Sequence, residues 1–236
     1  MVPVIKIIHA NLIRCFEFGL NIYQLSLLSL LLIYKKSKMK ASTAVYQLKT
    51  FPETFLRNNL LIIAGVKTSG VINNYYIESK DSANSSYNEA FKFTNFSSSE
   101  NKDTVAVHNV RMIPISEDFK HTAIESYPLT GGPDLMITGQ LTGCTFVTAN
   151  GGGSTLVAHI QPGGSRGSGQ ELRDNVLKNG RFKNHANQAV TVFGVGDYQG
   201  AAYVVGVRIG GQWQLYGQMV TGPGTNAQIT SVKRIA

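Results

Sequence analysis

Residues 138–161, TGQLTGCTFVTANGGGSTLVAHIQ, are expected to decide the fold, because two apolar runs flank a glycine-rich turn. Hairpin loops of four residues are common, and residues 150–153 would form one here. Antiparallel pairing then places Cys144 opposite His159, and directly opposed residues have Cβ atoms roughly 4.5–5.5 Å apart. The stretch therefore predicts a thiol and an imidazole side by side on one face of a sheet, where a histidine can activate a cysteine nucleophile.

The same two residues also have a structural interpretation. A cysteine in a strand is commonly a small buried apolar side chain, and a histidine there is commonly a hydrogen-bonded part of the core. A change of register by one residue would place Cys144 and His159 on opposite faces of the sheet. Composition does not decide between the catalytic and the structural interpretation.

Length and composition fit one domain with an extension. The chain has 236 residues, and a hydrophobic fraction of 43% is enough for a sizeable core. Because glycine is frequent (24 residues) and only 15% of residues are charged, a β-rich chain with many turns is expected. Two cysteines in separate regions give no disulfide framework and are compatible with a reducing compartment as the place of action.

The positive charge has no nucleic-acid-binding pattern. The net charge is +8, and lysines gather at residues 35–40 rather than along a recognition helix. Zinc-finger spacing, a basic zipper and an RNA-binding aromatic motif are all missing from the sequence, so no nucleic-acid partner is expected. Cys144 and His159 have no third ligand nearby in the sequence, and no phosphate-binding or dinucleotide loop is found. We therefore expect neither a metal nor a cofactor.

Residues 1–40 are expected to be an N-terminal extension, hydrophobic and then basic, ahead of a domain spanning 41–236. The apolar run at 20–34 is shorter than the roughly 20 residues that cross a bilayer, and no small-residue cleavage site follows it. Three interpretations stay open: a membrane-associating helix, a delivery segment, or an upstream extension outside the catalytic fold. We favour the last, with membrane contact through this segment.

Several further strands are expected before the hairpin. Residues 60–66 read as a buried strand, and the alternating residues 104–115 as another, with His108 in a structural or exposed role. The polar residues 73–103 predict a long excursion or a weak strand. In the hairpin itself, apolar residues occur on both faces, which predicts a sheet covered on both sides.

A helix and a β-rich C-terminal third are expected after the hairpin. Ser168 and Glu171 form a capping box, and Gly180 ends the helix. Beyond it, residues 189–220 predict a three-stranded meander, and 229–235 a last strand. Within the meander, Gly210-Gly211 predicts a two-residue primed turn, which places Arg208 opposite Trp213 and Val205 opposite Tyr216. The expected fold class is α+β: a mixed, mostly antiparallel, sandwich-like core with a few surface helices.

One resemblance adds to this pattern. Residues 141–144, LTGC, resemble the Leu-Ser-Gly-Cys motif of the bacterial toxin glutamine deamidases, which include the cytotoxic necrotizing factors and the Burkholderia lethal factor. In that family a catalytic histidine follows the nucleophilic cysteine across a glycine-rich turn, and His159 stands 15 residues after Cys144. Thr138 occupies the position, six residues before the cysteine, of a threonine that completes the site in the lethal factor and in chemoreceptor deamidases. The likeness covers about residues 100–220.

The resemblance implies a deamidase-type fold and hydrolysis of a protein glutamine side chain to glutamate. His159 would take the proton of Cys144, the ion pair would hold the thiolate, and the thiolate would attack the amide carbon. Backbone N–H groups near Gly143 and Cys144 would stabilise the oxyanion. Thr138 would complete the site, which requires a bend at Gly139 or Gly143 because about 20 Å of extended strand otherwise separates it from Cys144.

The same resemblance implies a partner and a place of action. The substrate would be a host protein, a Rho-type GTPase or a translation-initiation factor, that carries the target glutamine. The chain would act as a monomer, secreted or delivered into the host cell cytoplasm.

Two alternatives to a deamidase are open. A papain-like peptidase or amidase also uses cysteine and histidine, but it places the nucleophile at the start of a helix, whereas the residues after Cys144 read as a strand. A non-enzymatic β-sandwich binding module would leave Cys144 inert.

Overall fold

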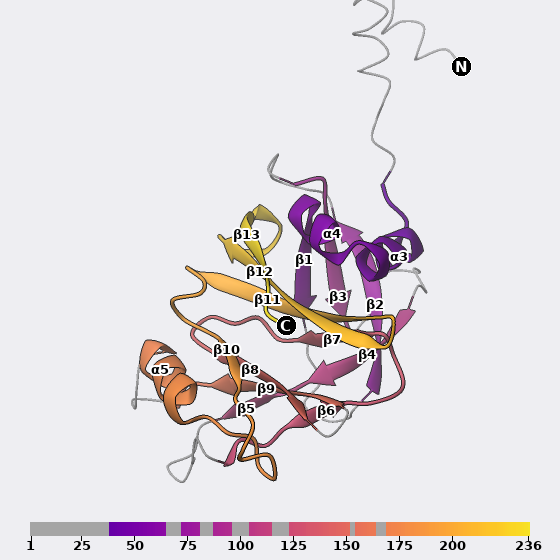
Figure 1. Cartoon of the computed structure of the whole chain (residues 1–236). Coiled ribbons are helices and arrows are strands. Elements are labelled where there is room, and N and C mark those ends of the chain that lie inside the picture. Colours follow the sequence, from indigo (N-terminus) through magenta and orange to yellow (C-terminus); the bar gives the residue numbers. More distant parts are fainter. Residues whose placement is uncertain are drawn as a thin grey trace, which may run out of the picture. The chain divides into compact units, whose positions relative to one another are not determined.

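Strands dominate the fold, which is α+β (Figure 1). The computed structural model describes residues 38–64, 72–80, 87–95, 104–114, 123–151, 154–163 and 169–236. This part of the chain has a large mixed sheet of eight strands that is nearly closed into a barrel, a smaller sheet of five strands and three α-helices. The expected extension lies, up to residue 37, outside the described residues, as does the expected helix cap Ser168.

The large sheet has the strand order β1-β3-β2-β4-β7-β11-β12-β13. Its strands are β1 (Asn59–Ala64), β2 (Ile72–Lys80), β3 (Glu89–Thr94), β4 (Thr104–Val110), β7 (Leu135–Thr138), β11 (Ala201–Ile209), β12 (Gln212–Thr221) and β13 (Gln228–Arg234). Neighbours are antiparallel except β1 with β3 and β4 with β7, which are parallel.

The small sheet has the order β10-β8-β9-β5, and β6 pairs with β9. Its strands are β5 (Met112–Pro114), β6 (Tyr127–Leu129), β8 (Thr145–Gly151), β9 (Ser154–Gln161) and β10 (Thr191–Phe193). The helices are α3 (Ala41–Thr50), α4 (Pro52–Asn58) and α5 (Gly169–Asn179), and a single 3₁₀ turn, η2, spans Gly224–Asn226.

Three apolar cores hold these layers together. Helices α3 and α4 cover the large sheet over one core, which includes Leu56 and Phe91. A second core lies between the two sheets, where Phe146 of β8 meets residues of β7, β11 and β12. The third lies between the other face of the small sheet and α5, with Val147 against Val176 and its neighbours. The hairpin is thus covered on both faces, as its sequence predicts.

The expected C-terminal hairpin is confirmed in its register. Arg208 pairs with Trp213, and Val205 with Tyr216. The turn residues Gly210 and Gly211 have φ of 58° and 82°, which a two-residue primed turn requires and glycine adopts without strain. The buried strand near residue 60 is confirmed as β1, and the last strand as β13.

Three predictions about the strands are wrong. Within residues 73–103, β2 and β3 are full members of the large sheet, since Tyr75, Phe91 and Phe93 supply the burial that the polar neighbours obscure. The single strand expected at 104–115 divides into β4 and β5, which belong to different sheets. The first strand of the expected meander, β10, pairs with β8 of the small sheet instead of with β11.

One of the three described helices is predicted from the sequence, and the other two are missed. Helix α5 is confirmed, ends before Gly180 and buries Leu172 and Val176. Helices α3 and α4 are missing from the sequence prediction because their apolar face is short, with only Ala41, Ala44 and Leu48 buried in α3. In the part of the chain that the structure describes, no helix is both long and apolar enough to cross a membrane.

Gln218 of β12 joins the large sheet to the α4–β1 segment. Its amide nitrogen donates to the carbonyls of Leu56 (2.6 Å) and Asn59 (2.7 Å), and its amide oxygen accepts the N–H of Leu61 (2.8 Å). Gln218 is fully buried, so each of these backbone groups would lose its partner without solvent to replace it. The side chain therefore fixes β1 against β12.

Gln218→Leu should lower the free energy of unfolding by roughly 3 kcal/mol, since a buried polar group left without a partner costs about 1–3 kcal/mol. Urea denaturation measures this loss. The matched control is Gln212→Leu, at an exposed position of the same strand, which should change stability by less than about 0.5 kcal/mol. Equal losses in the two variants would contradict the bridging role.

Candidate functional site

The β8–β9 hairpin has a tighter turn than the sequence predicts. Gly151 pairs with Ser154, so two residues rather than four separate the strands. His159 consequently lies opposite Phe146, and the predicted pairing with Cys144 is wrong. The strands extend further because Asn150 also joins the ladder, where its side chain accepts a hydrogen bond from Thr155 Oγ1 at 3.1 Å.

This shift of register leaves Cys144 and His159 on the same face of the hairpin. The pairing moves by two residues, an even number, so both side chains stay on the face that the prediction gave them. Cys144 comes immediately before Thr145, the first residue of β8, and Thr145 pairs with Ile160. If the strand geometry continued through Cys144, it would be a diagonal neighbour of His159, and such neighbours lie about 7–8 Å apart. Cys144 belongs to the core between the two sheets.

Thr138 reaches His159 because the chain turns sharply between β7 and β8. Thr138 ends β7 in the large sheet, while Thr145 begins β8 in the small one. Between them, Leu141 makes a bridge with Ala202 of β11, and Gly143 has φ of 122°, a conformation that favours glycine. The bend that the resemblance requires is therefore present, and Thr138 Oγ1 lies 2.7 Å from His159 Nδ1.

The hydrogen bonds of Thr138 determine the tautomer of His159. Thr138 Oγ1 donates its proton to the carbonyl of Val110 at 2.7 Å, and a hydroxyl has only one proton to donate. The contact with His159 must therefore be a hydrogen bond from Nδ1–H to Oγ1. The neutral ring then carries its free lone pair on Nε2.

His159 Nε2 is a buried polar atom without a hydrogen-bond partner among the residues that the structure describes. His159 is fully buried, and this burial lowers its pKa from the usual 6.5 to about 4, because a charged imidazolium would be poorly solvated. The ring is therefore neutral at pH 7, and Nε2 can accept a proton. A buried polar atom without a partner calls for an explanation, and for a histidine nitrogen one explanation is a catalytic role.

The Cys144 thiol is protonated in the resting structure. Burial raises its pKa, and a backbone hydrogen bond from Thr142 lowers it in part. With His159 neutral as well, the resting pair is a thiol and an imidazole, not the ion pair that the sequence prediction assumed. No hydrogen bond joins the two side chains, since Nε2 has no partner. Catalytic contacts of this kind are often loose before substrate binds.

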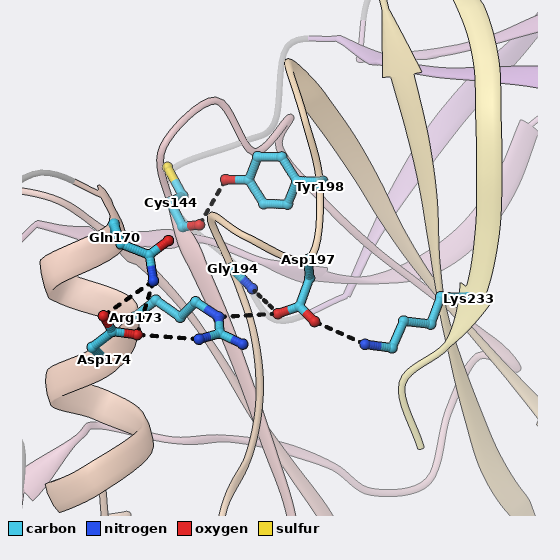
Figure 2. Close-up of polar contacts among 8 residues, drawn as sticks. All are labelled: Cys144, Gln170, Arg173, Asp174, Gly194, Asp197, Tyr198 and Lys233. Carbon is cyan, nitrogen blue, oxygen red and sulfur yellow. Dashed lines mark hydrogen bonds and ion pairs between the residues drawn. The ribbon is translucent and has the colours of Figure 1, made fainter.

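Tyr198 is a site residue that the sequence prediction missed. Its hydroxyl accepts a hydrogen bond from Gly143 N–H at 3.0 Å and donates one to the Cys144 carbonyl at 2.8 Å. The second of these is visible in Figure 2. Gly143 N–H, an expected oxyanion donor, is thus already occupied. Nothing in the sequence links Tyr198 to Cys144, which lies 54 residues earlier.

The described residues offer no metal centre, because no group of three or more histidine, cysteine, aspartate or glutamate side chains comes together among them. A groove of about 680 Å³ lies at the other end of the β8–β9 hairpin. Asn150, Arg208 and Trp213 are among its lining residues, whereas Cys144 and His159 are not. The groove is separate from the candidate site.

The buried His159 should make the fold sensitive to acid. Its pKa is lower in the folded state, about 4, than in the unfolded state, about 6.5. Its contribution to stability is therefore complete above pH 6.5 and is lost as the pH falls toward 4, by about 3 kcal/mol in total. Denaturation midpoints measured across this range should fall more steeply for the wild type than for His159→Gln. Parallel pH profiles of the two proteins would show that the imidazole is not buried in its neutral form.

Neither a scan against models of known protein families nor a search of curated protein sequences gives a match to this chain. The chemistry assigned to it therefore depends on the geometry of Cys144, His159 and Thr138 and on the short motif at residues 141–144.

Proposed function

We propose that the chain is a protein-glutamine deamidase of the bacterial toxin type, with Cys144 as nucleophile and His159 as base. The observation that supports this most strongly is the hydrogen bond from His159 Nδ1 to Thr138, which leaves a buried lone pair on Nε2 on the face of the hairpin shared by Cys144. A threonine, a cysteine and a histidine are the three residues that the resemblance brings together.

The reaction begins with a proton transfer. His159 Nε2 removes the proton of the Cys144 thiol as its sulfur attacks the amide carbon of the target glutamine. Because the pKa of His159 is lowered and that of Cys144 is raised, the thiolate is a minor species at rest. The transfer accompanies the attack, and the approach of the substrate amide draws the two side chains together.

The second half of the reaction releases ammonia and then glutamate. The tetrahedral intermediate breaks its C–N bond, and the imidazolium of His159 protonates the departing ammonia. A water molecule, deprotonated by the same Nε2, then attacks the thioester, and the C–S bond breaks to give the glutamate carboxyl group and the Cys144 thiol. Thr138 keeps the ring in one tautomer through both halves.

The start of α5 lies against the turn that precedes Cys144. A Cβ atom built on Gly169, its first residue, would lie 2.4 Å from the Gly143 carbonyl oxygen, so the helix N-terminus directly abuts the turn before Cys144. The group at the helix start is the Gly143 carbonyl oxygen, whose partial negative charge suits the positive end of a helix. Because Cys144 itself precedes a strand, this arrangement differs from that of a papain-like enzyme, in which the nucleophile begins the helix.

The substrate class follows from the resemblance. The partner is a host protein with an accessible glutamine, of the Rho-type GTPase or translation-initiation factor kind, and the chain reaches it after secretion or delivery into the host cytoplasm. Neither a metal nor a cofactor takes part in the steps above.

Mass spectrometry of host-cell proteins tests the proposal. A lysate incubated with the full chain should gain the amide-to-acid mass shift at a specific glutamine, with release of ammonia. The same lysate treated with Cys144→Ala should not. Peptide-bond cleavage in place of the mass shift would favour a peptidase, and the absence of both in an intact, folded preparation would favour a binding module.

A further inference from the structure

A tyrosine and an ion network lie directly behind the turn that presents Cys144. Tyr198 bonds the turn at two points, Gly143 N–H and the Cys144 carbonyl. The Gly143 N–H belongs to the peptide before the Gly143–Cys144 peptide, and the Cys144 carbonyl belongs to the peptide after it. The Tyr198 hydroxyl therefore holds the peptide planes on both sides of the Gly143–Cys144 peptide.

The middle peptide is fixed from the other side by α5. An added Cβ at Gly169 would be 2.4 Å from the oxygen of Gly143 and 3.0 Å from its carbonyl carbon, so the carbonyl points at the helix start. The described peptide bonds are all trans, and in a trans peptide the C=O and N–H point in opposite directions. The N–H of Cys144 is consequently directed away from α5. With Gly143 N–H occupied, Cys144 N–H is the member of the expected pair left as oxyanion donor.

Asp197, the residue before Tyr198, is held by three charged or polar contacts. The Asp197 carboxylate contacts Arg173 of α5 (3.2 Å), Lys233 of β13 (2.8 Å) and the N–H of Gly194 (3.1 Å), as Figure 2 shows. These contacts join α5, the large sheet and the loop between β10 and β11. The carboxylate side chain is only 11% exposed, which makes the ion pairs stronger than those of an open surface.

The charge of the Asp197 carboxylate supports the same arrangement. Burial alone would raise the pKa of Asp197, but hydrogen bonds from Lys233, Gly194 N–H and Arg173 outweigh it, and the pKa lies below its usual value. Asp197 is therefore ionised at neutral pH. The aromatic ring of Tyr198 packs on Phe193, with ring centroids 5.7 Å apart, so packing fixes the ring and leaves the hydroxyl to act on the turn.

We propose that Tyr198 is a positioning residue for the nucleophile, holding the Gly143–Cys144 turn through both of its hydrogen bonds, and that Asp197 with Arg173 and Lys233 fixes Tyr198 for this task. The inference rests on the proposed deamidation. One of its two tests, the alkylation of Cys144 by iodoacetamide, does not depend on that activity. Because the hydroxyl fixes the turn and touches no reacting atom, its loss affects turnover rather than substrate binding.

Tyr198→Phe removes one oxygen and keeps the ring. The matched control is Tyr216→Phe, since Tyr216 is equally buried and, among the described residues, its hydroxyl bonds the Gln214 side chain alone, at 2.7 Å. In Tyr198→Phe the rate at which iodoacetamide alkylates Cys144 should change several-fold across the pH range, and kcat for deamidation should fall about 10–100-fold with KM nearly unchanged. Tyr216→Phe should match the wild type in both.

The outcomes separate this inference from the proposed function. If the wild type deamidates nothing, the proposed function fails, while the alkylation profiles still test the positioning role. If the wild type is active, and Tyr198→Phe and Tyr216→Phe have the same kcat and the same alkylation rate per folded molecule, the positioning role is wrong. Should Tyr198→Phe not fold, Asp197→Asn serves in its place: a lower kcat at unchanged KM supports the inference, and wild-type kinetics overturn it.

Discussion

Cys144→Ser should abolish deamidation and leave the fold intact. A serine hydroxyl is a far weaker acid than a thiol, and His159, whose pKa is lowered to about 4, is too weak a base to activate it. Loss of the nucleophile in enzymes of this kind lowers kcat by roughly 10³-fold or more. Ammonia release and the mass shift of the target glutamine measure the loss.

The control for Cys144→Ser is a buried residue of the adjoining strand. Thr148 of β8 is buried, and its hydroxyl has no hydrogen-bond partner in the structure. Thr148→Val should therefore retain activity and be as stable as the wild type or more so, since it removes an unsatisfied polar group. Circular dichroism should give the same spectrum for all three proteins. Deamidation that persists in folded Cys144→Ser would contradict the assignment of the nucleophile.

Thr138→Val should lower kcat about 10–100-fold, the usual effect of removing a group that orients a catalytic histidine. Valine has the shape of threonine but cannot accept the Nδ1–H of His159 or donate to the Val110 carbonyl. The ring is then free to place its proton on Nε2, where the base is needed. The Val110 carbonyl also loses a buried donor, so the free energy of unfolding should fall by about 1–2 kcal/mol.

Thr138→Ser separates the two effects of that change. Serine restores the hydroxyl and both hydrogen bonds but leaves a small cavity where the methyl group was. It should recover most of kcat while remaining about 1 kcal/mol less stable than the wild type. Steady-state kinetics together with urea denaturation make the comparison. Equal activity of the valine and serine variants would show that the hydroxyl does not control the tautomer.

The central hairpin illustrates how far the sequence alone can lead. Its two apolar faces are readable from the apolar residues at successive positions of the strands, and the structure covers both. Its register was predicted wrongly because residues 150–153 fit a four-residue loop as well as a two-residue one, and the choice depends on how far the ladder extends past Asn150. At Gly210 and Gly211, by contrast, the turn length is unambiguous, and the predicted register is correct.

The candidate site, too, could be predicted from the sequence only in part. Local spacing indicates that Cys144 and His159 are close, and the resemblance adds Thr138, which local geometry would have placed too far away without a bend. Tyr198 and Asp197 could not be found, since their contacts join segments far apart in the chain and depend on how the sheets and α5 pack. The pKa shifts likewise depend on burial, which has no signature in the spacing of residues.

Nitrogen-resolved NMR of the His159 ring tests the central claim most directly. The full chain, labelled with ¹⁵N on histidine, is compared with His159→Gln to assign the signal. The account predicts a neutral ring at pH 7 with its proton on Nδ1 and a bare Nε2, protonating only near pH 4. A proton on Nε2, or an imidazolium at neutral pH, would contradict it, because neither form could accept the proton of Cys144.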